Sequence, residues 1–120
     1  MPHERCTGKW TKSTFKPSTT GQDEDDGEIT IDAHSGPVFT GTHHRTGASL
    51  TNTFCDGVNL RFTRISLTET VEYRGRIRTM SPNLDIIEEG TFDRNTNRFD
   101  QAGHGELRGD SGDWTAEKVT

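Results

Sequence analysis

The sequence has little apolar material and no long apolar run. Of its 120 residues, 27% fall in the hydrophobic class and 28% are charged, a composition close to that of disordered chains. No apolar stretch approaches the length that spans a membrane. The apolar residues fall instead in short alternating runs, which can supply a sheet that buries one face. At this length we expect one domain that covers residues 1–120.

Several binding classes lack their usual features. The net charge of −5 argues against a nucleic-acid groove, because such a groove needs clustered Lys and Arg. Arg74, Arg76 and Arg78 alternate along one predicted strand, so we expect them to form a solvated outer stripe. No phosphate-binding loop, Gly-x-Ser-x-Gly elbow or nucleophile triad is present. We therefore expect no cofactor, no nucleic-acid partner and no membrane partner.

The N-terminal segment and the two cysteines bear on the compartment. Met1–Arg5 has no apolar signal region, which predicts a cytoplasmic protein, or a secreted one if an upstream signal peptide has been removed. Cys6 and Cys55 belong to no Cys-x-x-Cys motif, which argues against a thiolate zinc site. Two free thiols are the expected state, although one disulfide between a strand start and a turn is open.

Strand signals recur at regular intervals, while helical periodicity is absent. The acidic run Asp23–Asp26 is interpreted as a solvated hairpin loop, because blocks of like charge repel. Asp56-Gly57 is a strong hairpin signal. Strands are expected over 7–15, 28–34, 38–44, 49–54, 58–64, 70–77, 84–92 and 112–119, with the polar segment 93–111 partly strand near 105–107.

The positions of the only two Trp residues indicate how the strands close. Trp10 and Trp114 lie just after turn residues on the first and last predicted strands. Closure would pair these strands, remove the exposed edges and bring the two rings together as a plug at one end. We therefore predict an all-β fold, an eight-stranded antiparallel up-and-down β-barrel. An immunoglobulin-like sandwich is the rival, but it favours a Trp in the middle of the chain.

Four short motifs resemble those of avidin- and streptavidin-like barrels in the calycin superfamily: Cys6–Thr11, Pro37–Thr42, Thr70–Gly75 and Gly112–Val119. A Gly-x-Trp opening is also similar to that of lipocalins. The resemblance implies a barrel that holds a small ligand at one end. The family binds biotin with an Asn, a Tyr and Trp residues of the middle strands. At the matching positions this chain has Lys12 and His43, and it has no Trp between Trp10 and Trp114. Biotin is therefore not expected to bind with a micromolar Kd (roughly −8 kcal/mol).

Strand alternation predicts which polar side chains point into the barrel. His43 shares a face with Phe39, and Glu88 shares one with Leu84 and Ile86. His44 faces the other way, so the His43-His44 pair does not readily chelate one metal ion. The candidate catalytic residues are His43, Glu88 and Tyr73, and the candidate ligand-binding residues are Lys12, Arg64, Phe39, Phe62, Trp10 and Trp114.

Three functions fit this interior. The first is a protein that binds a small molecule in a cavity with polar side chains at its base. The second is a small barrel enzyme of the isomerase, cyclase or dehydratase type, with His43 or Glu88 as base and Tyr73 or Arg64 stabilising an oxyanion. The third is a protein-interaction module, which a filled interior would favour. A structural alternative pairs Arg64 with Glu88 and leaves His43 as filling. Self-association stays open.

Overall fold

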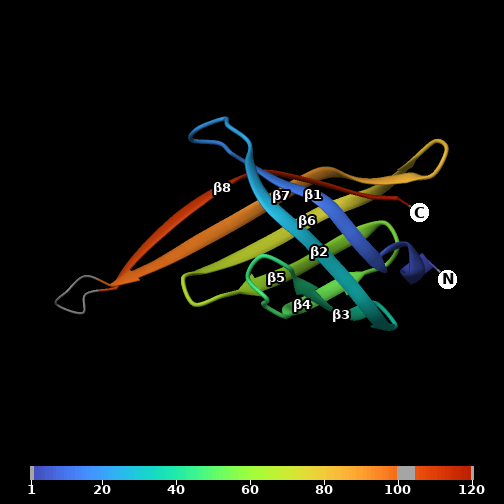
Figure 1. The fold of residues 1–120 in the computed structure, drawn as a ribbon, viewed down its shortest axis with the longest axis horizontal. Coiled ribbons are helices and arrows are strands. Elements are labelled where there is room, and N and C mark those ends of the chain that lie inside the picture. The colour runs from blue at the N-terminus through green and yellow to red at the C-terminus, as the bar shows by residue number, and fades with distance from the viewer. Residues whose placement is uncertain (1, 100–104, 120) are drawn as a thin grey trace.

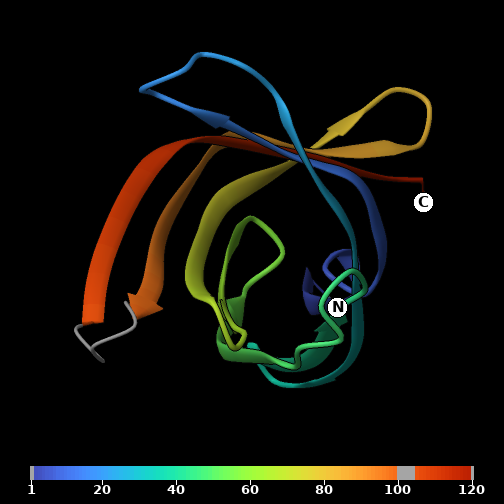
Figure 2. The ribbon, with the colours of Figure 1, turned by 60° about the vertical axis from the view of Figure 1, so that its left-hand side comes forward.

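The computed structural model describes residues 2–99 and 105–119, and it confirms the predicted fold class: eight antiparallel strands form a nearly closed barrel (Figures 1 and 2). The hydrogen-bonded order is β3-β2-β1-β8-β7-β6-β5-β4. A single-turn helix, η1, precedes the strands. The elements are η1 (Pro2–Arg5), β1 (Gly8–Pro17), β2 (Glu24–Ser35), β3 (Val38–His43), β4 (Leu50–Cys55), β5 (Asn59–Ile65), β6 (Glu69–Met80), β7 (Leu84–Phe99) and β8 (Gly105–Val119).

The first and last strands pair directly, as predicted. β1 lies between β2 and β8, with Phe15 opposite Trp114. The remaining seam joins β3 to β4 and contains one isolated bridge, Thr42 to Ser49. A side chain completes this seam, because Thr53 Oγ1 accepts from Phe39 N (3.1 Å) and donates to Phe39 O (2.8 Å). The barrel is therefore closed by strand pairing at β1–β8 and by mixed contacts at β3–β4.

The two Trp rings are buried at different levels of the barrel. Thr11 of β1 lies opposite Glu117, and Trp10 Nε1 donates to Cys6 O at 2.9 Å, so this ring sits at the end that carries the N-terminus. Trp114 lies opposite Phe15, nearer the other end of β8. The two rings thus do not form the joint plug that the sequence suggested.

Aromatic side chains fill the middle of the barrel. Phe15 stacks on Phe92 with ring centroids 4.3 Å apart, and Phe62 stacks on Tyr73 at 4.5 Å. Trp114 meets Tyr73 edge-on at 5.2 Å. These offset and edge-on arrangements are the favoured geometries for aromatic pairs. Gly90 lets β7 approach β8 here, because a Cβ at this position would collide with the Trp114 carbonyl oxygen.

Two irregularities reverse the strand alternation that the sequence predicted. In β1 the register shifts between Trp10 and Ser13, and Lys12 adopts φ 54°. Ser13 is therefore buried, while the Lys12 side chain is 76% exposed and pairs with Glu117 at 2.9 Å. The prediction that Lys12 faces the interior is wrong, because a β-bulge changes which face each later residue takes.

The same effect corrects the seventh strand. The β7–β8 register shifts between Ile86 and Thr91, and Glu89 adopts φ 55°. Asp85 and Ile87 are buried, whereas Glu88 is exposed and pairs with Arg78 at 3.0 Å. The prediction that Glu88 points inward beside Leu84 and Ile86 is therefore wrong.

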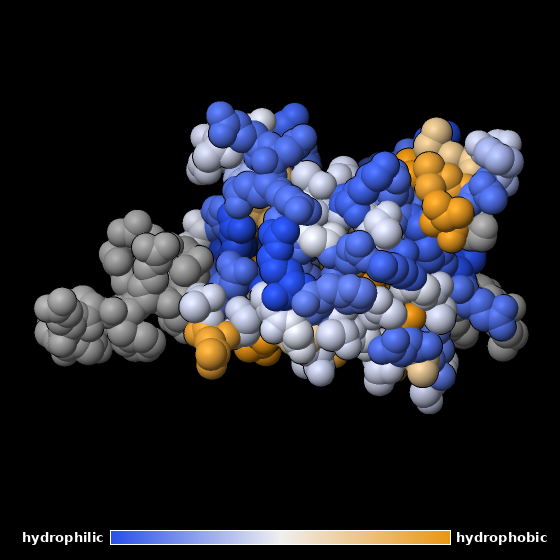
Figure 3. Space-filling model, in the orientation of Figure 1, coloured by the Kyte–Doolittle hydropathy of each residue, from blue (hydrophilic) through white to orange (hydrophobic). Residues whose placement is uncertain are grey.

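β7 and β8 are longer than predicted and extend past the rest of the barrel (Figure 1). The face in Figure 3 is mainly hydrophilic, with one apolar patch at its lower left and another around the β6–β7 turn. The register places Leu84 between Met80 and Val119 there, and the last two are exposed. Among the described residues, no helix is long and apolar enough to cross a membrane.

One end of the barrel is closed by η1 and a disulfide. Cys6 and Cys55 are bonded to each other, so the expectation of two free thiols is wrong. Arg5 Nη1 donates to Gly57 O at 2.9 Å. Lys118 Nζ, which lies 5.4 Å from the centroid of the Trp10 ring, donates to the carbonyl oxygens of Arg5 and Thr7. Burial lowers the pKa of this lysine. The N-terminal turn is thereby fastened across the barrel end.

Removing the disulfide should destabilise the barrel. Cys6 and Cys55 are 49 residues apart, and a bond that closes such a loop restricts the unfolded chain, which typically contributes about 2–4 kcal/mol. The double variant Cys6→Ser/Cys55→Ser should lose about that free energy of unfolding, measured by urea denaturation. Wild-type protein under reducing conditions should match the variant. Equal stability of the oxidised and reduced proteins would contradict the prediction.

Candidate functional site

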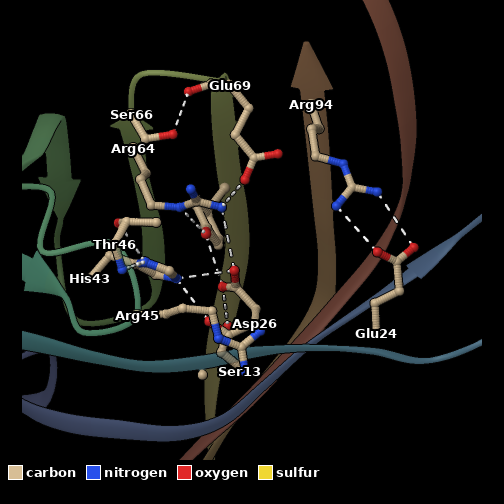
Figure 4. A network of polar contacts seen from close by, with 12 residues as sticks. Ser13, Glu24, Asp26, His43, Arg45, Thr46, Arg64, Ser66, Glu69 and Arg94 are labelled. Atoms are coloured by element: carbon tan, nitrogen blue, oxygen red, sulfur yellow. Dashed lines mark hydrogen bonds and ion pairs between the residues drawn. The ribbon is translucent and has the colours of Figure 1, made fainter. Parts of the chain in front are cut away.

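Buried charged side chains gather at the barrel end opposite the disulfide, around the carboxylate of Asp26 on β2 (Figure 4). Asp26 Oδ2 accepts from Ser13 Oγ at 2.8 Å and from Tyr73 OH at 2.9 Å. Oδ1 accepts from His43 Nε2 at 3.0 Å and from Arg64 Nη2 at 3.4 Å. The four donors come from β1, β6, β3 and β5. One carboxylate thus connects β2 to four other strands.

The sequence does not reveal Asp26, because the acidic run Asp23–Asp26 predicts a solvated loop. That interpretation is wrong for this residue: β2 begins at Glu24, and Asp26 is buried. Asp25 does remain exposed, and its carboxylate pairs with Arg45 at 2.8 Å. Gly27, with φ 90°, follows directly in a region where the β1–β2 register shifts. A glycine inside a strand often marks such a bulge, but Gly27 lies just outside the strand expected over 28–34, so the pattern did not mark Asp26.

His43 lies at the end of β3 and is buried, as predicted. Its Nε2 is within hydrogen-bonding distance of two acceptors, Asp26 Oδ1 (3.0 Å) and Asp26 O (2.8 Å). This nitrogen must therefore carry the proton. Nδ1 then accepts from the Thr46 hydroxyl at 2.8 Å. Both ring nitrogens are engaged within the protein.

Arg64 and Tyr73 form the other half of the site. The Arg64 side chain is 2% exposed. Its Nε donates to Tyr73 OH at 3.1 Å, and its Nη2 pairs with Glu69 Oε1 at 3.0 Å as well as with Asp26. Burial raises the pKa of the Tyr73 phenol, and the negative charge of Asp26 raises it further. Arg64 Nη1 is buried and has no hydrogen-bond partner among the described residues.

A second guanidinium covers the neighbouring part of the same end. Val71 of β6 lies in register between Arg64 and Arg94, so the two arginines flank it on adjacent strands. Arg94 pairs with Asp110 at 2.6 Å and with Glu24 at 3.3 Å. Its guanidinium also lies 5.5 Å from the centroids of the Phe15 and Phe92 rings. The hydrogen bonds that Arg94 donates to Asp110 raise the pKa of the Arg94 guanidinium. The aromatic centre is thus covered by ion pairs.

The structure brings together some of the predicted site residues and separates others. His43, Tyr73 and Arg64 share Asp26, and the buried Phe62 and Trp114 rings contact Tyr73. The expected Arg64–Glu88 pair is wrong, because Arg64 pairs with Asp26 and Glu69. Of the other candidates, Phe39 is buried against Phe62, and Trp10 lies at the disulfide end. Lys12 and Glu88 face outward. The residues of the network that the sequence did not reveal are Ser13, Asp26, Thr46 and Glu69.

Four clefts over the described residues have volumes of about 280, 500, 540 and 650 Å³, and none is lined by Asp26, His43, Arg64 or Tyr73. Within the described ranges, no group of three or more His, Cys, Asp or Glu side chains is placed to hold a metal ion. The site is a network of hydrogen bonds and ion pairs in which one buried donor nitrogen, Arg64 Nη1, has no partner among the described residues.

Comparisons with known proteins return no match: no family model, no curated protein and no solved structure is significantly similar to this chain. The eight-stranded up-and-down order is consistent with a calycin-like fold. Function must be argued from the geometry of the site.

Neutralising Asp26 should destabilise the barrel. Asp26→Asn keeps the side chain's shape but leaves Arg64 buried with only Glu69 as a charged partner, which should cost about 3 kcal/mol of unfolding free energy. Asp25→Asn is the matched control, because that residue is adjacent in sequence and exposed, and its unfolding midpoint should stay unchanged. Urea denaturation of both variants measures the difference. Equal effects of the two substitutions would show that Asp26 is not the centre of the network.

The phenol of Tyr73 should resist ionisation in the folded protein. Its pKa is raised above the ordinary value of 10.0, chiefly by burial, and it is the only tyrosine in the chain. Because the unfolded chain ionises first, this contribution to stability is complete below about pH 10 and falls as the pH rises further. Phenolate absorbance should therefore appear at higher pH for the native protein than for the chain in urea. Coincident titrations would contradict the burial.

Proposed function

We propose that the protein binds a small molecule at the Asp26 end of the barrel and that Arg64 recognises it. The observation that carries this proposal is the buried Arg64 Nη1, which has no partner among the described residues. Buried N–H groups are nearly always hydrogen-bonded, so an acceptor from outside the chain is the natural occupant. In Figure 4 this nitrogen has no dashed line and lies on the side away from Asp26.

The charges around Arg64 select the class of ligand. One guanidinium faces two carboxylates, Asp26 and Glu69, so the cluster is already negative when His43 is neutral. A second buried anion would be repelled at short range. A neutral oxygen acceptor, such as an amide, lactam or ketone carbonyl, satisfies Nη1 without that cost. The nearby aromatic rings favour an apolar body on the same molecule.

Glu69 is the side chain that a ligand would displace in order to reach Arg64. Its side chain is 24% exposed, whereas Asp26 is buried, so Glu69 is the outer partner of Arg64. It begins β6, directly after the β5–β6 turn, where Ser66 donates from both N and Oγ to the Glu69 carbonyl. Rotation of the Glu69 side chain would break its ion pair with Arg64 Nη2 and free the outer side of the guanidinium. The calycin-like motifs support the same placement, because the resemblance implies a ligand at one barrel end.

The enzyme alternative receives less support from this geometry. A general base needs a free ring nitrogen or carboxylate, yet both nitrogens of His43 are engaged and Glu88 lies outside. Tyr73 is held as a neutral phenol, since its pKa is raised. The filled aromatic centre supports a protein-interaction module more than it supports an enzyme.

A ligand screen with matched compounds tests the proposal. Neutral lactams and amides, their carboxylate analogues and biotin would be assayed by thermal shift and calorimetry. Neutral carbonyl compounds should raise the melting temperature of the wild-type protein, whereas biotin should show no micromolar binding. Arg64→Lys keeps the charge but removes Nη1, so it should lose the shift while circular dichroism confirms its fold. If no neutral compound binds, or if binding survives in Arg64→Lys, the proposal fails.

Glu69→Gln tests the charge argument separately. The substitution removes one negative charge from the outer, partly exposed position and leaves the Asp26 network in place. It should improve carboxylate binding relative to the wild-type protein by about tenfold, the effect of 1.4 kcal/mol. An unchanged preference for neutral compounds would show that the two carboxylates do not determine selectivity.

A further inference from the structure

Two arginines face each other on the outer surface of the barrel. Arg61 of β5 and Arg74 of β6 are register partners, and both are exposed. The next arginines along β6 have acidic partners: Arg76 pairs with Glu89 and Arg78 with Glu88. Within the described residues, Arg61 and Arg74 have no carboxylate at ion-pair distance. Like charges directly opposite each other destabilise a sheet, so a bound anion would relieve the repulsion between the two guanidinium groups.

The pair borders a small cleft of about 280 Å³. Arg61 lies 5.0 Å from the centroid of the Phe54 ring, and this stacking holds its guanidinium plane in place. Its N–H edges stay available for an acceptor. The charged residues that line the cleft are three arginines, Arg61, Arg74 and Arg76, and one carboxylate, Glu89.

The acidic groups nearby do not form ion pairs with Arg61 or Arg74 among the described residues. Glu89 lies 3.8 Å from Arg76, which occupies it. Glu72 is two residues from Arg74 on β6, but it lines a separate cleft together with Asp93 and Asp113. Arg74 stands between the two clefts, because it lines both. The cleft on the Arg61 side therefore holds both members of the Arg61–Arg74 pair.

We propose that Arg61 and Arg74 bind a tetrahedral oxyanion, phosphate or sulfate, either free or as an ester group of a larger small molecule. Guanidinium groups bind such anions through paired N–H donors, which gives both strength and geometry. The net charge of −5 disfavours a long polyanion, because the rest of the surface would repel it. The site lies on the outer face of β5, whereas Arg64 is buried inside, so this proposal does not depend on the proposed function.

The test is a titration followed by the Nε–Hε signals of the arginines in nuclear magnetic resonance spectra. Inorganic phosphate and inorganic sulfate should each shift the Arg61 and Arg74 signals saturably at low ionic strength, while chloride at equal ionic strength should not. Phenyl phosphate distinguishes the sources: at least tenfold tighter binding than inorganic phosphate assigns the site to esters, and equal or weaker binding assigns it to the free ion.

Matched variants decide whether the pair itself binds. Arg61→Gln and Arg74→Gln should each weaken binding at least tenfold, and both should fold because the side chains are exposed. Arg78→Gln is the control, since it removes the same charge from the same face of β6 at a residue that Glu88 already pairs. Its affinity should match that of the wild-type protein. No saturable shift, or an equal loss in Arg78→Gln, would overturn the proposal.

Discussion

The barrel end opposite the disulfide depends on the hydrogen bonds and ion pairs that the carboxylate of Asp26 accepts. A buried carboxylate is costly unless its acceptor sites are used, and here four donors from four strands use them. Ser13 in turn accepts from Trp114 Nε1 at 2.8 Å, so β8 joins the same network. Because each donor is fixed by its own strand, the carboxylate also fixes the register of those strands relative to one another.

The two ends of the barrel are closed by different chemistry. At one end a disulfide and the carbonyl oxygens around Lys118 fasten the N-terminal turn. At the other end ion pairs of Arg64 and Arg94 cover the aromatic rings. Arg64 is buried and has five N–H groups, which are hard to satisfy fully, whereas the Arg5 guanidinium at the disulfide end is partly exposed. This asymmetry explains why the unused donor, and with it the candidate site, lies at the end covered by ion pairs.

The fold was readable from the sequence, and the site only in part. Strand number, order and closure follow from alternation, turn residues and the placement of Trp10 and Trp114. His43, Tyr73 and Arg64 were found because regular alternation holds in β3, β5 and the inner part of β6. Lys12 and Glu88 were misplaced because bulges change the face, and a bulge depends on the neighbouring strand. Asp26 was missed for a related reason: composition predicts exposure for an acidic run, and only tertiary donors make burial of one member favourable.

β5 shows how one strand can present two opposite environments to ligands. Arg61 and Arg64 are three residues apart, so alternation places them on opposite faces, and the structure has the first exposed and the second buried. The inner arginine faces two carboxylates, which leaves its surroundings negative and favours a neutral acceptor. The outer arginine faces a second arginine, which leaves its surroundings positive and favours an oxyanion. Under the two proposals the same type of side chain would therefore select different ligands, and the partners that β2 and β6 place opposite it would make the selection.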